Sequence, residues 1–295
     1  MKRVALLACA VALAAVAAGC GGPTVGDGDL TDDWAMLATA KVPEPAAGSC
    51  WTSSANQVRD TTMSEAQLQP CDMDHVIETA SVGHFTGEAA AGRKRPTGAA
   101  LAPAWADCDK AVTEYLGAEW QSGRVVAVLV PPNPWQWDGG ARFYRCDVVS
   151  LRTELGVLDP RKTTMKGALG PTGDLRLTCG QQVGMTKDSW SDITPAKCEE
   201  PHDVEYVGTI SSPAADYPTG AGVEAAFSKT CEAKMLAYIG MSRGSWNGQR
   251  ALNYGYWMTG NKDTWALGNH TARCYALISG KKVNRSLRGA GDVTV

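Results

Sequence analysis

The spacing of apolar residues along the chain predicts two helices and several short strands. Between residues 103 and 116, the side chains of Trp105, Cys108 and Leu116 recur at the spacing of one helix face, and Gly117 follows as a natural helix C-cap. Runs rich in β-branched residues predict the strands. The elements predicted in this way are strands at 50–51, 76–82, 124–130 and 143–151, a second helix at 222–239, and strands at 204–210, 252–259 and 272–278.

The same order of elements occurs twice, and the residues around the cysteines repeat with it. Each copy contains a cysteine followed at the same offsets by a histidine and a glutamate. These triplets are Cys71, His75 and Glu78 in the first copy and Cys198, His202 and Glu205 in the second. A tryptophan, a glycine and an arginine also recur before the last cysteine of each copy: Trp137, Gly140 and Arg145, then Trp265, Gly268 and Arg273. The chain is therefore predicted to be a duplicated module.

We predict an α+β fold in which two tandem copies of a small antiparallel sheet each carry one helix and are stapled by disulfides. The segment between the copies is rich in Pro, Gly and Lys, and the final segment is basic and polar, so we expect a linker and a frayed tail. The predicted organisation is a signal peptide at 1–19, lipidated Cys20 with a flexible tether at 20–48, module 1 at 49–151, a linker at 152–177, module 2 at 178–280, and a polar tail at 281–295.

The N-terminal segment predicts export and lipid anchoring. Lys2 and Arg3 precede an apolar run at 4–18, which is too short to span a bilayer but typical of a signal peptide. The run ends on Ala-Ala-Gly-Cys20, the pattern of a bacterial lipobox, in which the cysteine sulfur is lipidated before cleavage. An ordinary cleaved signal is the alternative. No later segment is apolar enough to cross a membrane, so the lipid is the expected membrane attachment, at the outer face of the cytoplasmic membrane.

Export favours disulfides over a metal site for the eight remaining cysteines. Pairing within each copy leaves three connectivities per module. We favour joining the first cysteine to the second and the third to the fourth, because the first two flank short hairpin-like strands and the last two would staple the helix to the sheet. The favoured pairs are Cys50–Cys71, Cys108–Cys146, Cys179–Cys198 and Cys231–Cys274. Zinc binding by cysteine and histidine is the alternative.

Charge excludes two classes of partner. The formal net charge is −3, and cleavage of the signal removes Lys2 and Arg3 as well. The only dense basic run is 93–95, between Gly-Ala repeats and a proline, where a solvated loop is expected. Without a basic stripe, we expect binding neither to nucleic acid nor to anionic lipid headgroups.

The second copy resembles a known family. The segment from Cys198 to Gly208 has the sequence Cys-Glu-Glu-Pro-His-Asp-Val-Glu-Tyr-Val-Gly, which includes Pro201, His202 and Glu205. It resembles the Cys-x-x-Pro-His-x-x-Glu motif of the septum formation domain family. The later residues Cys231, Trp265, Gly268 and Cys274 are similar to that family as well, whereas the first copy has Asp74 in place of the proline. The resemblance implies an actinobacterial, extracytoplasmic and non-enzymatic domain connected with septum or envelope processes.

The repeated histidine and glutamate invite a metal or catalytic interpretation. Strand residues three apart face opposite sides, so His202 and Glu205 would converge on one ion only if the segment turns. We therefore expect a structural role for these two residues and for His75 and Glu78. Contact with a partner, and metal binding or catalysis, are the alternatives.

A second pattern suggests hydrolase chemistry. Residues 240–244 have the sequence Gly-Met-Ser-Arg-Gly, which matches the nucleophile elbow of α/β-hydrolases. That chemistry needs a strand before Ser242 and a helix after it, whereas a helix is predicted before it. A hydrolase therefore remains a distant alternative.

The chain contains ten tryptophans but only three phenylalanines. Tryptophan fills the thin cores of small disulfide-rich domains, and the repeated Trp137 and Trp265 fit that role. Trp135 aligns with Asp263 in the second copy, so a surface position is expected for it. Stacked tryptophans also bind sugars, and Trp135 is the best candidate for such a contact.

Together these observations predict a non-enzymatic, lipid-anchored accessory protein in septum formation or envelope assembly, with no cofactor and no metal. The expected partner is a protein or a cell-wall glycan. A peptidoglycan- or glycan-binding lipoprotein is the alternative function.

Overall fold

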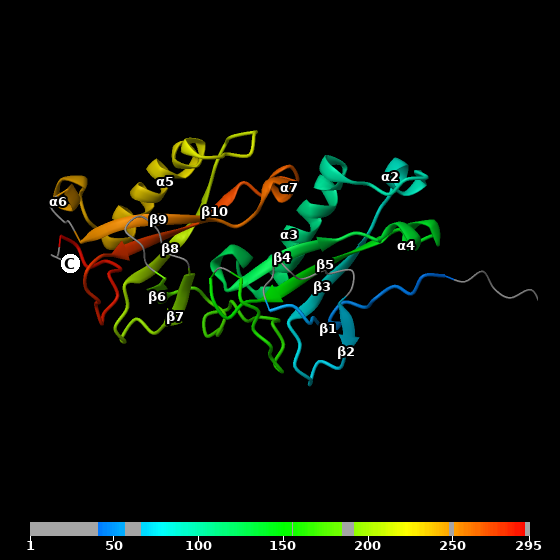
Figure 1. Ribbon diagram of the computed structural model, residues 1–295, viewed down its shortest axis with the longest axis horizontal. Coiled ribbons are helices and arrows are strands. Elements are labelled where there is room, and N and C mark those ends of the chain that lie inside the picture. The colour runs from blue at the N-terminus through cyan, green and yellow to red at the C-terminus, as the bar shows by residue number, and fades with distance from the viewer. Residues whose placement is uncertain (1–40, 57–65, 155, 185–191, 248–250, 293–295) are drawn as a thin grey trace, which may run out of the picture. The chain divides into compact units, whose positions relative to one another are not determined.

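The computed structural model describes residues 41–56, 66–154, 156–184, 192–247 and 251–292 (Figure 1). Lys41–Val295 form one compact unit. The predicted signal peptide, Cys20 and most of the tether lie outside the described residues. Among the described helices, none has both the length and the apolar character needed to span a bilayer.

Each module is a five-stranded antiparallel sheet. In module 1 the strand order is β2-β1-β3-β5-β4, and in module 2 it is β7-β6-β8-β10-β9. The strands of module 1 are β1 (Cys50–Thr52), β2 (Gln67–Gln69), β3 (Ile77–His84), β4 (Val125–Val130) and β5 (Phe143–Ser150). The strands of module 2 are β6 (Cys179–Val183), β7 (Asp192–Ala196), β8 (Val204–Ser211), β9 (Leu252–Met258) and β10 (Thr271–Ile278). The second sheet repeats the topology of the first, strand for strand.

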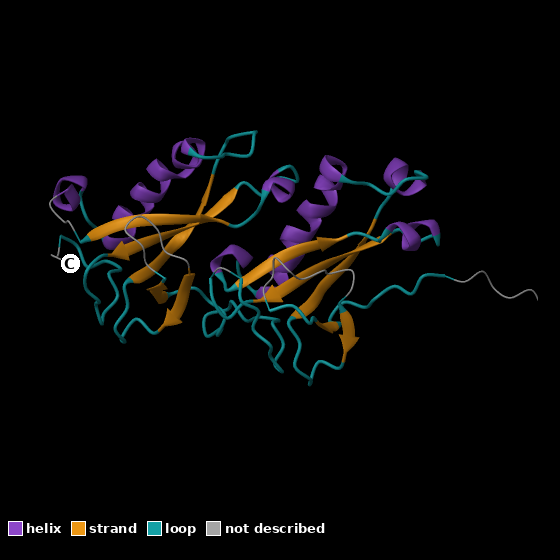
Figure 2. Ribbon diagram, in the orientation of Figure 1, coloured by secondary structure: helices purple, strands orange, loops and turns teal. Residues whose placement is uncertain are grey.

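One long helix packs on one face of each sheet (Figures 1 and 2). These helices are α3 (Ala102–Leu116) and α5 (Ala221–Ile239). Their buried apolar residues meet those of the sheet in a continuous core, and each helix ends at a glycine with left-handed backbone, Gly117 or Gly240. The short helices are α2 (Gly87–Ala91), α4 (Pro134–Asp138), α6 (Arg243–Asn247) and α7 (Lys262–Trp265), and the 3-10 turns are η4 (Gly98–Leu101) and η5 (Trp120–Ser122).

The structure pairs the cysteines as the sequence favoured. Cys108–Cys146 and Cys231–Cys274 staple the long helix of each module to its central sheet. Cys50–Cys71 and Cys179–Cys198 close the β1–β2 and β6–β7 hairpins. The α+β class and the duplication of the sheet are confirmed.

The predicted elements agree with the structure to within about two residues, but β2, β6 and β7 have no counterpart among the predicted strands. β2 has only three residues, Gln-Leu-Gln, which are too few to establish an alternating pattern. β7 contains Pro195, which lowers the expectation of a strand, although an edge position tolerates it.

The structure differs from the prediction most clearly in the linker and the tail. Residues 161–169 cross module 1 and residues 283–291 cross module 2 as packed, hydrogen-bonded segments. We call these segments the straps. Each begins at a backbone bridge to the repeated histidine, His75 with Arg161 and His202 with Val283. Each strap then buries an apolar side chain, Met165 or Leu287, against the core. The tail is therefore not frayed over its described part, because it completes the core of module 2.

Candidate functional site

The repeated histidine and glutamate meet in both modules. The Nε2 atom of His75 lies 2.8 Å from Oε1 of Glu78, and in module 2 the distance from His202 to Glu205 is 2.9 Å. All four side chains are buried. The pairs converge because each histidine precedes its strand, β3 or β8, and sits at the strap bridge, while the glutamate is on the strand itself. The prediction that the two side chains face opposite sides of a regular strand is therefore wrong, because the histidine is not on the strand.

The carboxylate of Glu78 is surrounded by hydrogen-bond donors from distant parts of module 1. Tyr115 of α3 donates its hydroxyl at 2.6 Å, the hydroxyl of Thr164 donates at 3.0 Å, and the backbone N–H of Met165 donates at 2.9–3.0 Å. The site thus connects the strand, the helix and the strap. Burial raises the pKa of Tyr115 to about 12, and its hydrogen bond to Glu78 adds to the rise. Tyr115 therefore remains a donor at neutral pH.

Module 2 repeats this arrangement. Glu205 accepts the hydroxyl of Tyr238 at 2.9 Å, the hydroxyl of Ser286 at 2.9 Å, and the backbone N–H of Leu287 at 2.7 Å. Burial again raises the pKa of Tyr238 to about 12. Since two modules with different surroundings keep the same set of donors, this arrangement is part of the fold.

Each histidine ring is fixed at its other nitrogen as well. Nδ1 of His75 lies 2.9 Å from the carbonyl oxygen of Met73, and Nδ1 of His202 lies 2.8 Å from that of Glu200. A carbonyl oxygen only accepts, so Nδ1 carries a proton in both rings. The remaining hydrogen bond, between Nε2 and the carboxylate oxygen, therefore contains one proton that the histidine and the glutamate share.

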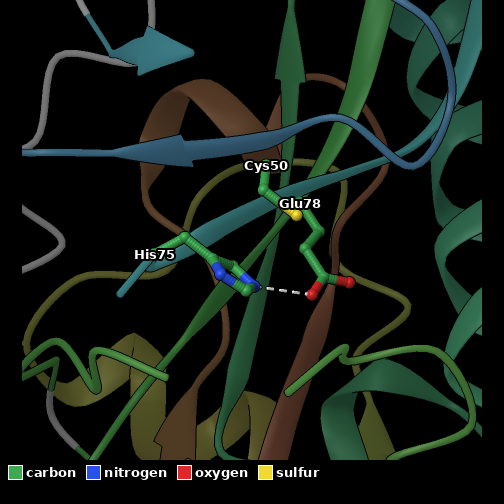
Figure 3. A group of neighbouring side chains, drawn as sticks. All are labelled: Cys50, His75 and Glu78. Atoms are coloured by element: carbon green, nitrogen blue, oxygen red, sulfur yellow. Dashed lines mark hydrogen bonds and ion pairs between the residues drawn. The ribbon is translucent and has the colours of Figure 1, made fainter. Parts of the chain in front are cut away.

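A cysteine sulfur completes each cluster. The Sγ atom of Cys50, a ring nitrogen of His75 and a carboxylate oxygen of Glu78 all lie within 4.8 Å of one another (Figure 3). Cys179, His202 and Glu205 form the same group. These are the described residues best suited to hold a metal ion. In this structure both sulfurs belong to disulfides, and metal ligation by cysteine requires a thiolate. In the oxidised state the cluster therefore acts as a structural clamp.

The straps also carry a sequence repeat that the pattern of cysteines did not indicate. Thr164-Met165-Lys166-Gly167-Ala168 in module 1 corresponds to Ser286-Leu287-Arg288-Gly289-Ala290 in module 2. The first residue of each donates its hydroxyl and the second its backbone N–H to the glutamate. Comparing the linker with the tail would have found this hydroxyl–apolar–basic–Gly–Ala signal.

An arginine at equivalent positions has different partners in the two modules. In module 1, Arg145 pairs with Asp147 at 2.8 Å and lies over the ring of Trp51. In module 2 the equivalents of Asp147 and Trp51 are Tyr275 and Gly180, neither of which carries a carboxylate.

Arg273 instead connects the two modules. Its guanidinium donates to Glu154 at 2.6 Å and to the carbonyl oxygens of Gln121, Gly123 and Val125 in module 1. Burial alone would lower the pKa of Arg273, but the carboxylate of Glu154 outweighs this and raises it. Arg273 is therefore charged, and the ion pair is part of the contact between the modules.

The tryptophans divide into buried and exposed groups. Trp137 and Trp265 are in the core, whereas the side chain of Trp135 on α4 is 83% exposed. Trp257 lines a cleft of about 380 Å³ between β4 and the end of β9. Trp137 and Trp265 are therefore core residues and Trp135 is a surface residue, as the sequence predicted.

The remaining motif residues have conformational roles. Ser242 follows α5 directly, and its hydroxyl accepts a hydrogen bond from the N–H of Ser245 in the next turn. No strand precedes it, so it is not in a nucleophile elbow. Pro201 is exposed, and its carbonyl oxygen accepts a hydrogen bond from the side chain of Gln181.

The fold and the repeated clamp define a class of duplicated, disulfide-braced α+β protein. A family model described as septum formation matches residues 47–274. The chain belongs to the septum formation family, as its motif at Cys198–Gly208 predicted. The family is not a known enzyme family, and membership supports a septum-related role. No curated protein and no solved structure matches the chain.

Proposed function

We propose that the protein is a lipid-anchored, extracytoplasmic and non-enzymatic accessory protein that serves septum formation by binding a partner. The observation that carries the proposal is the state of the two clusters. Both nitrogens of each buried histidine and both oxygens of each buried glutamate are engaged by groups of the protein itself. These histidines and glutamates therefore stabilise the fold, and neither is directed at a substrate as a general acid or base. The partner is therefore expected to bind at the surfaces of the two modules and not at the clusters.

The experiment uses a depletion strain of the source bacterium, complemented with the natural chain or with Cys20→Ala. We expect depletion to lengthen cells and delay septa, and the natural chain to restore both. Cys20→Ala protein should leave the membrane fraction, because it lacks the site of the lipid, and should fail to restore septation. Restoration by protein that is free of the membrane would contradict the anchored role. Normal septation on depletion would contradict the septal role.

A second candidate function is binding of cell-wall glycan, and the exposure of Trp135 favours it. An indole that is 83% exposed offers a face on which a sugar ring can stack. In a pull-down with isolated cell wall, Trp135→Ala should reduce retention about ten-fold. Leu68 is also exposed and apolar, at 64%, so Leu68→Ala is the matched control and should leave retention unchanged. Equal retention of both variants would contradict this candidate.

A further inference from the structure

We infer that each cysteine–histidine–glutamate cluster becomes a Zn²⁺ site when its neighbouring disulfide is reduced. The ligands in module 1 would be Cys50, Cys71, His75 and Glu78, and those in module 2 would be Cys179, Cys198, His202 and Glu205. This inference is independent of the proposed function, because it concerns the chemistry of the clusters and not the surfaces of the modules.

The positions of the candidate ligand atoms are close to those that zinc requires. Tetrahedral zinc holds sulfur at about 2.3 Å and nitrogen or oxygen at about 2.0–2.2 Å, so its ligand atoms are separated by about 3.3–3.8 Å. The Nε2 atom of His75 and Oε1 of Glu78 are 2.8 Å apart, and the sulfur of Cys50 lies within 4.8 Å of both residues. Shifts on the order of 1 Å would place these three groups around one ion. The sulfur of Cys71 is bonded to that of Cys50 but is not part of the group of atoms within 4.8 Å, so after reduction its side chain would have to turn toward the ion to supply the fourth ligand.

The surroundings already orient the ligands. Metal-bound histidines commonly donate their second ring N–H to a carbonyl oxygen, which leaves the other nitrogen for the metal. His75 makes this bond to Met73, and His202 makes it to Glu200. The hydroxyls of Tyr115 and Thr164 hold Oε2 of Glu78, and its Oε1 faces the histidine. Module 2 has the same outer contacts.

Exposure makes selective reduction possible. Cys71 is exposed and Cys198 is half-buried, so a dithiol reductant can attack either sulfur. The cysteines of the two helix–sheet disulfides are at most 1% exposed. Reduction transfers two electrons from the dithiol, which becomes a disulfide, and leaves two thiols in the module. Zn²⁺ then displaces both thiol protons and the proton shared by the histidine and the glutamate, so that three protons are released per ion.

The experiment uses the purified mature chain, treated with a dithiol until only Cys50–Cys71 and Cys179–Cys198 are reduced, as shown by alkylation of a separate sample, and then freed of reductant without oxygen. With Zn²⁺ we expect two ions per reduced chain, none per oxidised chain, and three protons released per ion. With Co²⁺ we expect the absorption spectrum of a tetrahedral thiolate site. His75→Gln should lower the count to one. The matched control His84→Gln, at an exposed histidine, should leave it at two.

A variant that needs no reductant provides a second test. In Cys71→Ser the disulfide cannot form, so Cys50 keeps a thiol beside His75 and Glu78 while the rest of the chain stays oxidised. This variant should retain one Zn²⁺ per chain, and adding His75→Gln should abolish retention. The inference is wrong if the selectively reduced chain retains no metal. It is equally wrong if the count is unchanged in His75→Gln, since the thiols alone would then hold the ion.

Discussion

A chain that ends at Gly280 will fail to fold module 2, although it keeps every predicted strand and helix of that module and both of its disulfides. Amide hydrogen exchange measures the effect by segment. We expect β8, β9 and β10 to lose their protection, while β3, β4 and β5 of module 1 keep theirs and serve as the internal reference. The segment removed is the one whose composition predicted only a polar tail.

The expected effect is large because the strap contributes several buried interactions at once. Deletion removes the buried side chain of Leu287, which costs about 2–5 kcal/mol. It also leaves the buried carboxylate of Glu205 without the donors from Ser286 and Leu287, and loss of donors by a buried acceptor costs about 1–3 kcal/mol. The sum is comparable with the whole stability of a typical domain, about 5–15 kcal/mol.

The control is a chain that ends at Asp292, which keeps the strap and should show the exchange protection of the full chain. If the chain that ends at Gly280 protected β8–β10 as well as this control does, the strap would not stabilise module 2, and the structural role of the Glu205 cluster would be contradicted.

The second large effect is expected at the contact between the modules. Replacement of Arg273 by methionine should lower the free energy of unfolding by about 3–5 kcal/mol, because Glu154 is left buried without its cation and three carbonyl oxygens of module 1 lose their donor. Unfolding in urea should also separate into two transitions, one for each module, because the contact that couples them is lost.

The double variant Arg273→Met with Glu154→Gln separates two causes of the lost stability. One is the uncompensated buried charge of Glu154, and the other is the loss of the hydrogen bonds from Arg273. The double variant should recover part of the loss, since no uncompensated charge remains. Arg176, which is exposed and donates to the carbonyl of Pro171, is the matched control, and Arg176→Met should change stability by less than about 0.5 kcal/mol. A loss at Arg273 no larger than that at Arg176 would show that the ion pair does not join the modules.

Much of this fold could be predicted because its signals are local. Apolar residues at helical spacing marked α3 and α5, and runs of β-branched residues marked β4 and β5. The spacing of the cysteines and the elements on which they lie were enough to favour the observed pairs. The histidine and the glutamate of each cluster were also identified, since they follow a cysteine at the same offsets in both copies. The sulfur beside them belongs to Cys50 or Cys179, and not to the Cys71 or Cys198 of the predicted triplet.

The sequence could not predict how those side chains are used. The regular strand geometry suggested that His75 and Glu78 diverge, and only the turn at the strap bridge brings them together. The strap donors come from residues 87 and 82 positions beyond Glu78 and Glu205, in segments too polar and too short to show a periodic pattern. Such contacts depend on the path of the whole chain.

The duplication, the long helices, most strands, the favoured cystine pairs and the family could all be predicted from the sequence. These properties depend on local periodicity and on repeated residue types. The tertiary structure alone decided that the straps complete both cores, that the glutamates bind helix, strand and strap together, and that Arg273 pairs with Glu154 between modules while Arg145 pairs within its own. The physical reason is that a buried charge takes whichever partner the fold brings within hydrogen-bond distance, and the identity of that partner is not encoded near it in the chain.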